Sequence, residues 1–148
     1  MARIERFEDI VAWQKARSLN KKIYLITGRA EFSRDYDLAR QIRRASISIT
    51  SNIAEGFERG RTKEFLYFLN VAKASAAEVR SQLYVANDLD YINEEKAKEL
   101  LADITEISRM ISGLMKYLNN QSANEVRELD GIYNSEENTF QLSHFNTL

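Results

Sequence analysis

Apolar residues recur at alternating steps of three and four positions along four stretches of this chain, the spacing that places side chains on one face of an α-helix. The fourth stretch keeps this spacing most strictly, through Ala97, Leu100, Ile104, Ile107, Ile111, Leu114 and Leu118. The third keeps it through Phe65, Leu69, Ala72, Ala76, Val79, Leu83 and Ala86. The pattern predicts helices over residues 8–27, 34–57, 62–89 and 93–119. We therefore expect an all-α fold, an antiparallel up-down-up-down four-helix bundle with a less regular C-terminal tail.

The second predicted helix combines a narrow apolar stripe with many small residues. The stripe consists of Leu38, Ile42, Ala45, Ile49 and Ile53, and Ala and Ser occupy many of the positions between them. Small side chains at contact positions let neighbouring helix backbones approach closely, so this helix is predicted to be central in the bundle. The same helix carries three arginines at i, i+3 and i+4, which gather on one face: Arg40, Arg43 and Arg44.

Residues typical of helix ends mark the connections. Gly28 is placed to end the first helix. Ser33 and Thr62 are placed to cap the second and third helices, and Asn93, followed by two glutamates, to begin the fourth. Phe32, in the first connection, is predicted to plug one end of the bundle.

The apolar periodicity fades after Asn119, which divides the chain into a bundle, residues 1–119, and a polar C-terminal tail, residues 120–148. Low hydrophobicity predicts a loosely ordered tail. The alternative is that its scattered apolar residues contact a neighbouring subunit.

The composition narrows the possible chemistry. The 148 residues include no Cys and no Pro, which excludes disulfides and thiolate sites and favours long uninterrupted helices. No apolar run approaches the roughly 18 residues that span a bilayer. Residues 1–6 lead directly into polar sequence without an apolar signal core. The sequence predicts a cytoplasmic protein that does not enter a membrane.

No recognisable catalytic apparatus is present. The only histidine, His144, falls in the tail, which removes Ser-His pairs and Glu-x-x-His metal motifs from the bundle. The two glycines between Glu55 and Arg61 lack the spacing of a phosphate loop. Glu55 and Glu78, predicted on facing helices, are more typical of structural ion pairs than of acid–base catalysis. We expect a non-enzymatic protein without cofactor, metal or small-molecule substrate.

Charge is distributed unevenly although the net charge is only −1. Residues 1–80 hold 16 Lys and Arg against 10 Asp and Glu, a net of +6, whereas residues 81–148 hold 5 against 12, a net of −7. Either the two halves neutralise each other across helix contacts, or a basic face meets a polyanion. The candidate basic residues are Arg40, Arg43, Arg44, Arg59, Arg61, Lys63, Lys73 and Arg80.

Aromatic residues outside the apolar stripe of the third helix suggest a second contact surface. Tyr67, Phe68 and Tyr84 fall beside or opposite that stripe. We interpret them as a subunit interface, with packing inside one subunit as the alternative.

Three segments also resemble a known family. They are "FEDIVAWQKARSLNKKIY" (7–24), "QIRRASISITSNIAEG" (41–56) and "KEFLYFLNVAKASAAEVRSQLYVANDLDYI" (63–92). Together they resemble the bacterial four-helix-bundle family of 23S rRNA intervening-sequence proteins, or S23 ribosomal proteins, over residues 7–118. Relatives often carry proline where this chain has Thr50. A distantly similar bundle, the accessory protein of diversity-generating retroelements, is pentameric and binds nucleic acid, so the resemblance implies a homo-oligomer, most simply a pentamer.

The resulting hypothesis is an oligomeric helical bundle that associates with RNA or a ribonucleoprotein through a basic surface. The alternative is a structural or protein-interaction scaffold that does not contact nucleic acid.

Overall fold

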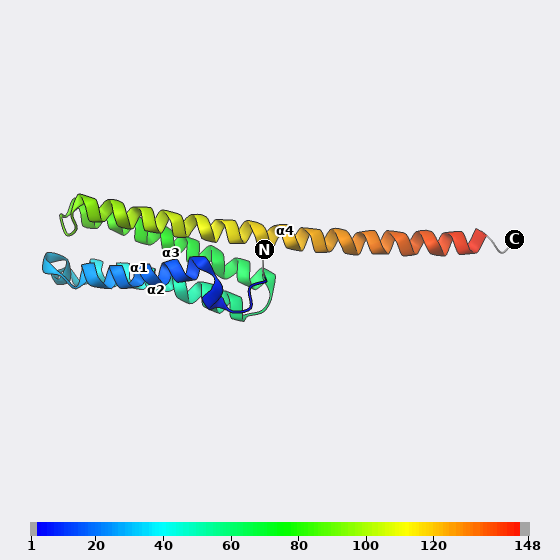
Figure 1. The fold of residues 1–148 in the computed structure, drawn as a ribbon, viewed down its shortest axis with the longest axis horizontal. Helices are drawn as coiled ribbons and strands as arrows, with labels where there is room; N and C mark the ends of the chain where they lie inside the picture. Colours follow the sequence, from blue (N-terminus) through cyan, green and yellow to red (C-terminus); the bar gives the residue numbers. More distant parts are fainter. Residues whose placement is uncertain (1–2, 146–148) are drawn as a thin grey trace. The chain divides into compact units, whose positions relative to one another are not determined.

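Residues 3–145 fold into four long helices and two short helical turns (Figure 1). The computed structural model describes the backbone of residues 3–145 and the side chains of residues 3–125, 127 and 128. In chain order the elements are the 3-10 turn η1 (Phe7–Asp9), α1 (Val11–Thr27), the 3-10 turn η2 (Ala30–Arg34), α2 (Tyr36–Glu58), α3 (Thr62–Asp88) and α4 (Glu94–Phe145). No strand occurs within the described backbone, and the predicted all-α four-helix bundle is confirmed.

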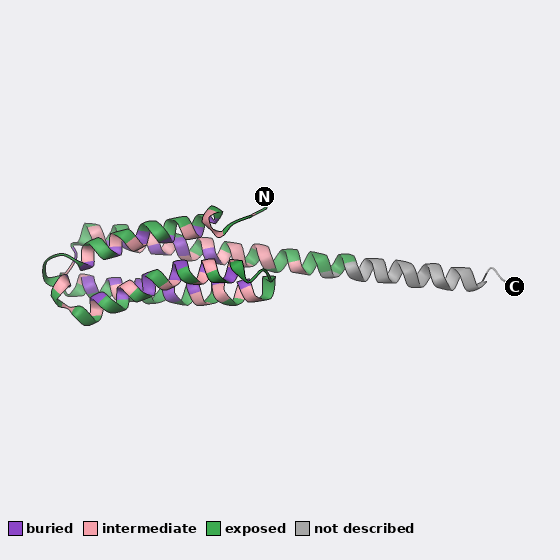
Figure 2. Cartoon of the chain, turned by 90° about the horizontal axis from the view of Figure 1, so that it is seen from below, coloured by how far each residue is buried: buried purple, intermediate pink, exposed green. Residues whose placement is uncertain are grey.

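Two units make up the chain, Met1–Met115 and Lys116–Leu148. In the first unit, α1 contacts α2 and α2 contacts α3, while ion pairs join α1 to α4. The helices therefore surround a single core, and their inner faces are buried (Figure 2). The fully buried side chains include Leu19, Ile23, Phe32, Ile42, Ile49, Ile53, Leu69, Leu83, Leu100, Ile104, Ile107 and Ile111.

The helix predicted over 93–119 begins at Glu94 and continues to Phe145, well beyond its predicted end. Fading of the apolar stripe did not mark a helix terminus, because the chain contains no proline to stop the helix. The proposed domain boundary at residue 119 stays a prediction. His144 and the apolar side chains of the tail from Leu129 onward lie outside the described side chains.

Two of the predicted helix caps are wrong. Asp35, not Ser33, caps α2, and its carboxylate accepts a hydrogen bond from the Leu38 N–H at 3.1 Å. Ser33 lies inside η2, where its hydroxyl donates to the Ala30 carbonyl at 2.6 Å, so α2 begins two residues later than predicted. Thr62 is the first residue of α3, after Arg61, whose side chain makes no capping bond.

The other predicted ends are confirmed. Gly28 is the C-cap of α1. Asn93 caps α4 through a 2.7 Å bond from the Lys96 N–H to its Oδ1. Phe32 is completely buried and its ring meets that of Tyr91 at 5.2 Å, so it plugs this end of the bundle as predicted.

Candidate nucleic-acid interface

Polar side chains inside the α1–α2 contact fix how α2 is rotated. Ser46, completely buried, donates to Asn20 Oδ1 at 2.6 Å, and Asn20 Nδ2 donates to Thr50 Oγ1 at 3.2 Å. Buried polar groups need partners, so these bonds favour the rotation that points Ser46 and Thr50 toward α1. Arg43, three residues before Ser46, then reaches the C-terminal end of α1.

Arg43 is held in place by α1. Its Nε donates to Thr27 Oγ1 at 2.7 Å, and its guanidinium lies over the Tyr24 ring, 4.6 Å from the centroid. The Thr27 hydroxyl is buried and donates its own proton to the Ile23 carbonyl at 2.7 Å, which leaves its oxygen to accept from Arg43. The guanidinium is therefore fixed by both an α1 hydroxyl and an α1 ring.

A surface hollow of about 650 Å³ opens beside this arginine. That volume falls within the range of ligand sites, roughly 300–1,000 Å³. Three of its lining residues are arginines and none is acidic; the lining comprises Tyr24, Thr27, Gly28, Ser33, Tyr36, Ala39, Arg40, Arg43, Arg44, Ile47 and Ser48. Among the described side chains, no carboxylate lies within ion-pair distance of any of the three arginines. The hollow is therefore an uncompensated cluster of positive charge.

The structure brings only part of the predicted basic set to this hollow. Arg59 instead pairs with Glu55 at 3.0 Å and lies over the Phe68 ring, 5.3 Å from its centroid. Arg61 and Lys63 are exposed at the α2–α3 connection, near the opposite end of α2 from Arg40.

Lys73 and Arg80 are exposed on a different side of α3. Ser75 faces α2, since its hydroxyl lies 2.9 Å from that of Ser48. At about 100° per residue, Lys73 and Arg80 are turned roughly 160° and 140° from Ser75. They therefore point away from α2 and do not extend the hollow. The single basic region that we predicted divides into separate groups.

Residues 8–113 match the model of the 23S rRNA-intervening sequence protein family. The chain belongs to this family. A solved structure is similar, that of a protein of unknown function from the S23 ribosomal protein family of Bacteroides thetaiotaomicron VPI-5482. It is 25% identical with a TM-score of 0.67, and the match covers 72% of this chain and 96% of that one. No curated protein matches the chain.

The segment Asn52–Gly56, part of the family resemblance, has a structural role in this member of the family. Asn52 donates to the carbonyl and hydroxyl oxygens of Ser48 at 2.7 and 2.9 Å, inside its own helix. Gly56 is buried beneath Phe68, and a Cβ at Gly56 would lie 2.6 Å from the Phe68 Cβ. The glycine therefore permits the close approach of α2 and α3 near their connection. The hydrogen bonds of Asn52 thus lie within α2, and Glu55 pairs with Arg59 on the surface.

The predicted interface residues do not form one patch. Tyr67 is 65% exposed, and its ring meets the half-buried ring of Phe68 edge-on at 5.3 Å. Tyr84 is exposed 17 residues later, about 25 Å further along α3. Phe68 is committed in part to packing against Gly56 in the same chain. The subunit interface of Tyr67, Phe68 and Tyr84 stays a prediction.

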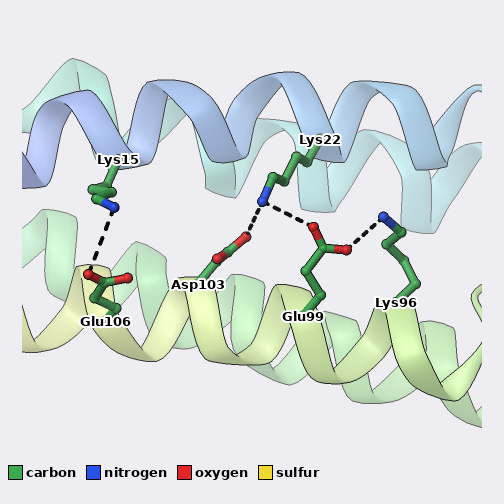
Figure 3. Close-up of polar contacts among 6 residues, drawn as sticks. All are labelled: Lys15, Lys22, Lys96, Glu99, Asp103 and Glu106. Atoms are coloured by element: carbon green, nitrogen blue, oxygen red, sulfur yellow. Dashed lines mark hydrogen bonds and ion pairs between the residues drawn. The ribbon is translucent and has the colours of Figure 1, made fainter.

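Two cations of α1, Lys15 and Lys22, are paired with acidic residues of α4, unlike the arginines of α2. Lys22 contacts Asp103 at 2.8 Å and Glu99 at 3.2 Å, Glu99 also contacts Lys96 at 2.7 Å, and Lys15 contacts Glu106 at 4.0 Å (Figure 3). The hydrogen bond to Asp103 raises the pKa of Lys22, and that from Lys96 lowers the pKa of Glu99, with Lys22 adding to the effect. Neutralisation between the two halves of the chain thus takes place at the α1–α4 contact.

The chemistry available at the hollow is anion binding. Within the described residues no group of His, Asp and Glu has the arrangement of a metal site. In the same part of the chain, no helix is long and apolar enough to cross a membrane.

Sequence reasoning missed the two tyrosines of the hollow, Tyr24 and Tyr36. The i, i+4 spacing of Tyr36 and Arg40 was a signal for the second, since it places both on one helix face. Tyr24 is contributed by another helix, so only the packing of α1 on α2 brings it to the arginines.

Proposed function

We propose that this member of the 23S rRNA-intervening sequence protein family is a non-enzymatic, homo-oligomeric protein that binds RNA through the hollow between α1 and α2. The observation that carries the proposal is a cavity lined by Arg40, Arg43 and Arg44 and by no acidic residue. The name of the family supports the choice of RNA among polyanions.

The arrangement of the arginines suits phosphate. A guanidinium offers several N–H donors in a plane and binds phosphate oxygens in pairs. Arg43 donates its Nε–H to Thr27, which leaves its two terminal nitrogens free to donate to a ligand in the hollow. Arg40 and Arg44 are exposed and lie one turn apart on α2, so each adds a positive charge beside that of Arg43.

The test compares two variants that remove the same charge from different places. Arg40→Gln/Arg44→Gln removes two positive charges from the lining of the hollow, and Lys73→Gln/Arg80→Gln removes two exposed positive charges from α3. Binding of a fluorescently labelled structured RNA is followed by anisotropy at several salt concentrations. We expect the hollow variant to bind more weakly, with a salt dependence reduced by about one unit of slope per lost phosphate contact, and the α3 variant to bind almost as well as the wild type.

Two results would overturn the proposal. One is the absence of RNA binding by the wild type at low salt. The other is an equal loss in both variants, since equal loss reports net charge and not a site. Because Arg40 and Arg44 are exposed and make no ion pair among the described side chains, their replacement should leave the urea-unfolding midpoint unchanged, which serves as the folding control.

The oligomer is the second part of the proposal. Tyr67, 65% exposed on α3, is the observation that favours a protein contact outside the single chain. We expect a pentamer, to be measured by light scattering on the eluting protein, and dissociation on Tyr67→Ser. A monomeric wild type at high protein concentration would remove this part. A scaffold role without nucleic acid is favoured if the oligomer forms but RNA binds nowhere.

A further inference from the structure

The hollow contains aromatic and apolar surface as well as charge. Tyr36 is 76% exposed and Tyr24 is 46% exposed, and Ile47 adds an exposed aliphatic side chain. One face of Tyr24 is already covered by Arg43. Tyr36 differs, because among the described residues its hydroxyl makes no hydrogen bond and its ring stacks on no other ring. The fold itself gives this large exposed ring no function.

Tyr36 lies in line with the arginines. Tyr36, Arg40, Arg43 and Ile47 follow one another at i, i+4, i+7 and i+11 along one face of α2, a stripe of about 16 Å at the helical rise. The aromatic ring at one end and the guanidinium groups beside it match the bases and phosphates of a nucleotide strand. Bases stack on rings, and phosphates bind guanidinium groups.

The charge of the surface changes from positive to negative at Tyr36. On the other side of this residue a second depression is lined by Glu31, Arg34, Asp35, Tyr36, Asp37 and Tyr91, of which three are acidic. A rigid RNA duplex lying along the arginines would carry its next phosphates over these carboxylates, where like charges repel. A single strand can end or turn at Tyr36 and avoid them.

The bases of duplex RNA also cannot stack on the Tyr36 ring. In an A-form helix the faces of the bases are covered by their neighbours, whereas unpaired bases in loops and ends are free to stack on aromatic side chains. We propose that the hollow binds an unpaired segment of RNA, with a base stacked on Tyr36 and the adjoining phosphates on Arg40, Arg43 and Arg44. This inference rests on the proposed RNA-binding function and specifies which form of RNA the site takes.

The experiment compares a labelled 12-nucleotide single-stranded RNA with a 12-base-pair duplex containing the same sequence, by anisotropy at one salt concentration. The variants are Tyr36→Leu, which removes the ring but keeps an apolar side chain, and Tyr36→Phe, which keeps the ring. We expect the wild type to prefer the single strand. Tyr36→Leu should weaken single-strand binding on the order of tenfold and leave duplex binding unchanged, and Tyr36→Phe should bind like the wild type.

The outcomes separate this inference from the function on which it rests. If Arg40→Gln/Arg44→Gln weakens RNA binding but Tyr36→Leu does not, or if duplex and single strand bind equally, the hollow binds phosphates only and the inference fails while the proposed function stands. If the wild type binds neither RNA at low salt, both fail. Tyr36 is largely exposed, so neither substitution should alter the unfolding midpoint, and this is checked on the same samples.

Discussion

Gly56 offers a sharp test of how closely α2 and α3 approach. A Cβ added there would lie 2.6 Å from the Cβ of Phe68 and 3.4 Å from the carbonyl oxygen of Phe65. The first distance is shorter than carbon atoms tolerate. Because a Cβ is attached directly to the backbone, Phe68 cannot relieve the overlap by changing its rotamer. Gly56→Ala must therefore push α3 away from α2 near their connection.

Two opposing terms set the size of the effect. Alanine is favoured over glycine inside a helix by about 0.8–1 kcal/mol. Overpacking a close contact costs about 1–3 kcal/mol. We therefore expect Gly56→Ala to be destabilising by up to about 2 kcal/mol. Gly113, in α4, has no atom within 4 Å of its added Cβ, so Gly113→Ala should show only the first term and stabilise the protein by about 0.5–1 kcal/mol.

The same substitution at two helical glycines is thus expected to act with opposite sign. Urea unfolding of both variants and the wild type, followed by far-ultraviolet circular dichroism, gives the midpoints and slopes that yield each change in the free energy of unfolding. The two variants should differ by about 1–3 kcal/mol. A Gly56→Ala midpoint equal to or above that of Gly113→Ala would refute the close approach of the two helices.

Three further changes test other contacts. The hydrogen bond to Asp35 raises the pKa of Tyr91, so this bond stabilises the fold fully below the unperturbed pKa of 10.0 and ceases to do so as the pH rises through the folded pKa. Tyr91→Phe should therefore be less stable than the wild type at neutral pH but lose less stability above about pH 10. Urea unfolding at several pH values measures both effects. Asn20→Leu leaves the buried Ser46 hydroxyl without its acceptor and should lower the free energy of unfolding by about 1–3 kcal/mol. Adding Ser46→Ala should restore part of that loss, and a double-mutant cycle that shows no coupling between the two positions would contradict this contact. Lys22→Met removes half-exposed ion pairs and should cost less than about 1 kcal/mol, a difference that vanishes in high salt if the pairs are the cause.

The bundle core was predictable because burial follows helical periodicity directly. Ile42, Ile49 and Ile53 repeat at steps of seven and four, and all three are completely buried. Helix ends were less predictable, because residues compete locally for the same role. Ser33 and Asp35 are both good caps, and Asp35 prevails because a 3-10 turn occupies the residues before it.

The candidate site was predictable only as far as one helix determines it. Arg40, Arg43 and Arg44 share a face of α2 by spacing alone, so their grouping follows from the sequence. The partners of Arg43 do not, because Thr27 lies 16 residues away and its position depends on how α1 is rotated against α2. The separation of Lys73 from this group has the same origin, since it depends on which side of α3 faces α2.

Asp35 has a kinetic consequence for the closed end of the bundle. One carboxylate oxygen caps the first turn of α2, and the other accepts the Tyr91 hydroxyl at 3.0 Å, 56 residues further along the chain. Because closing so long a loop costs entropy, we expect this bond to form late in folding, after α2 and α3 have come together. Contacts that form after the transition state leave the folding rate almost unchanged and lower the unfolding rate. We therefore expect this carboxylate to lengthen the lifetime of the native bundle.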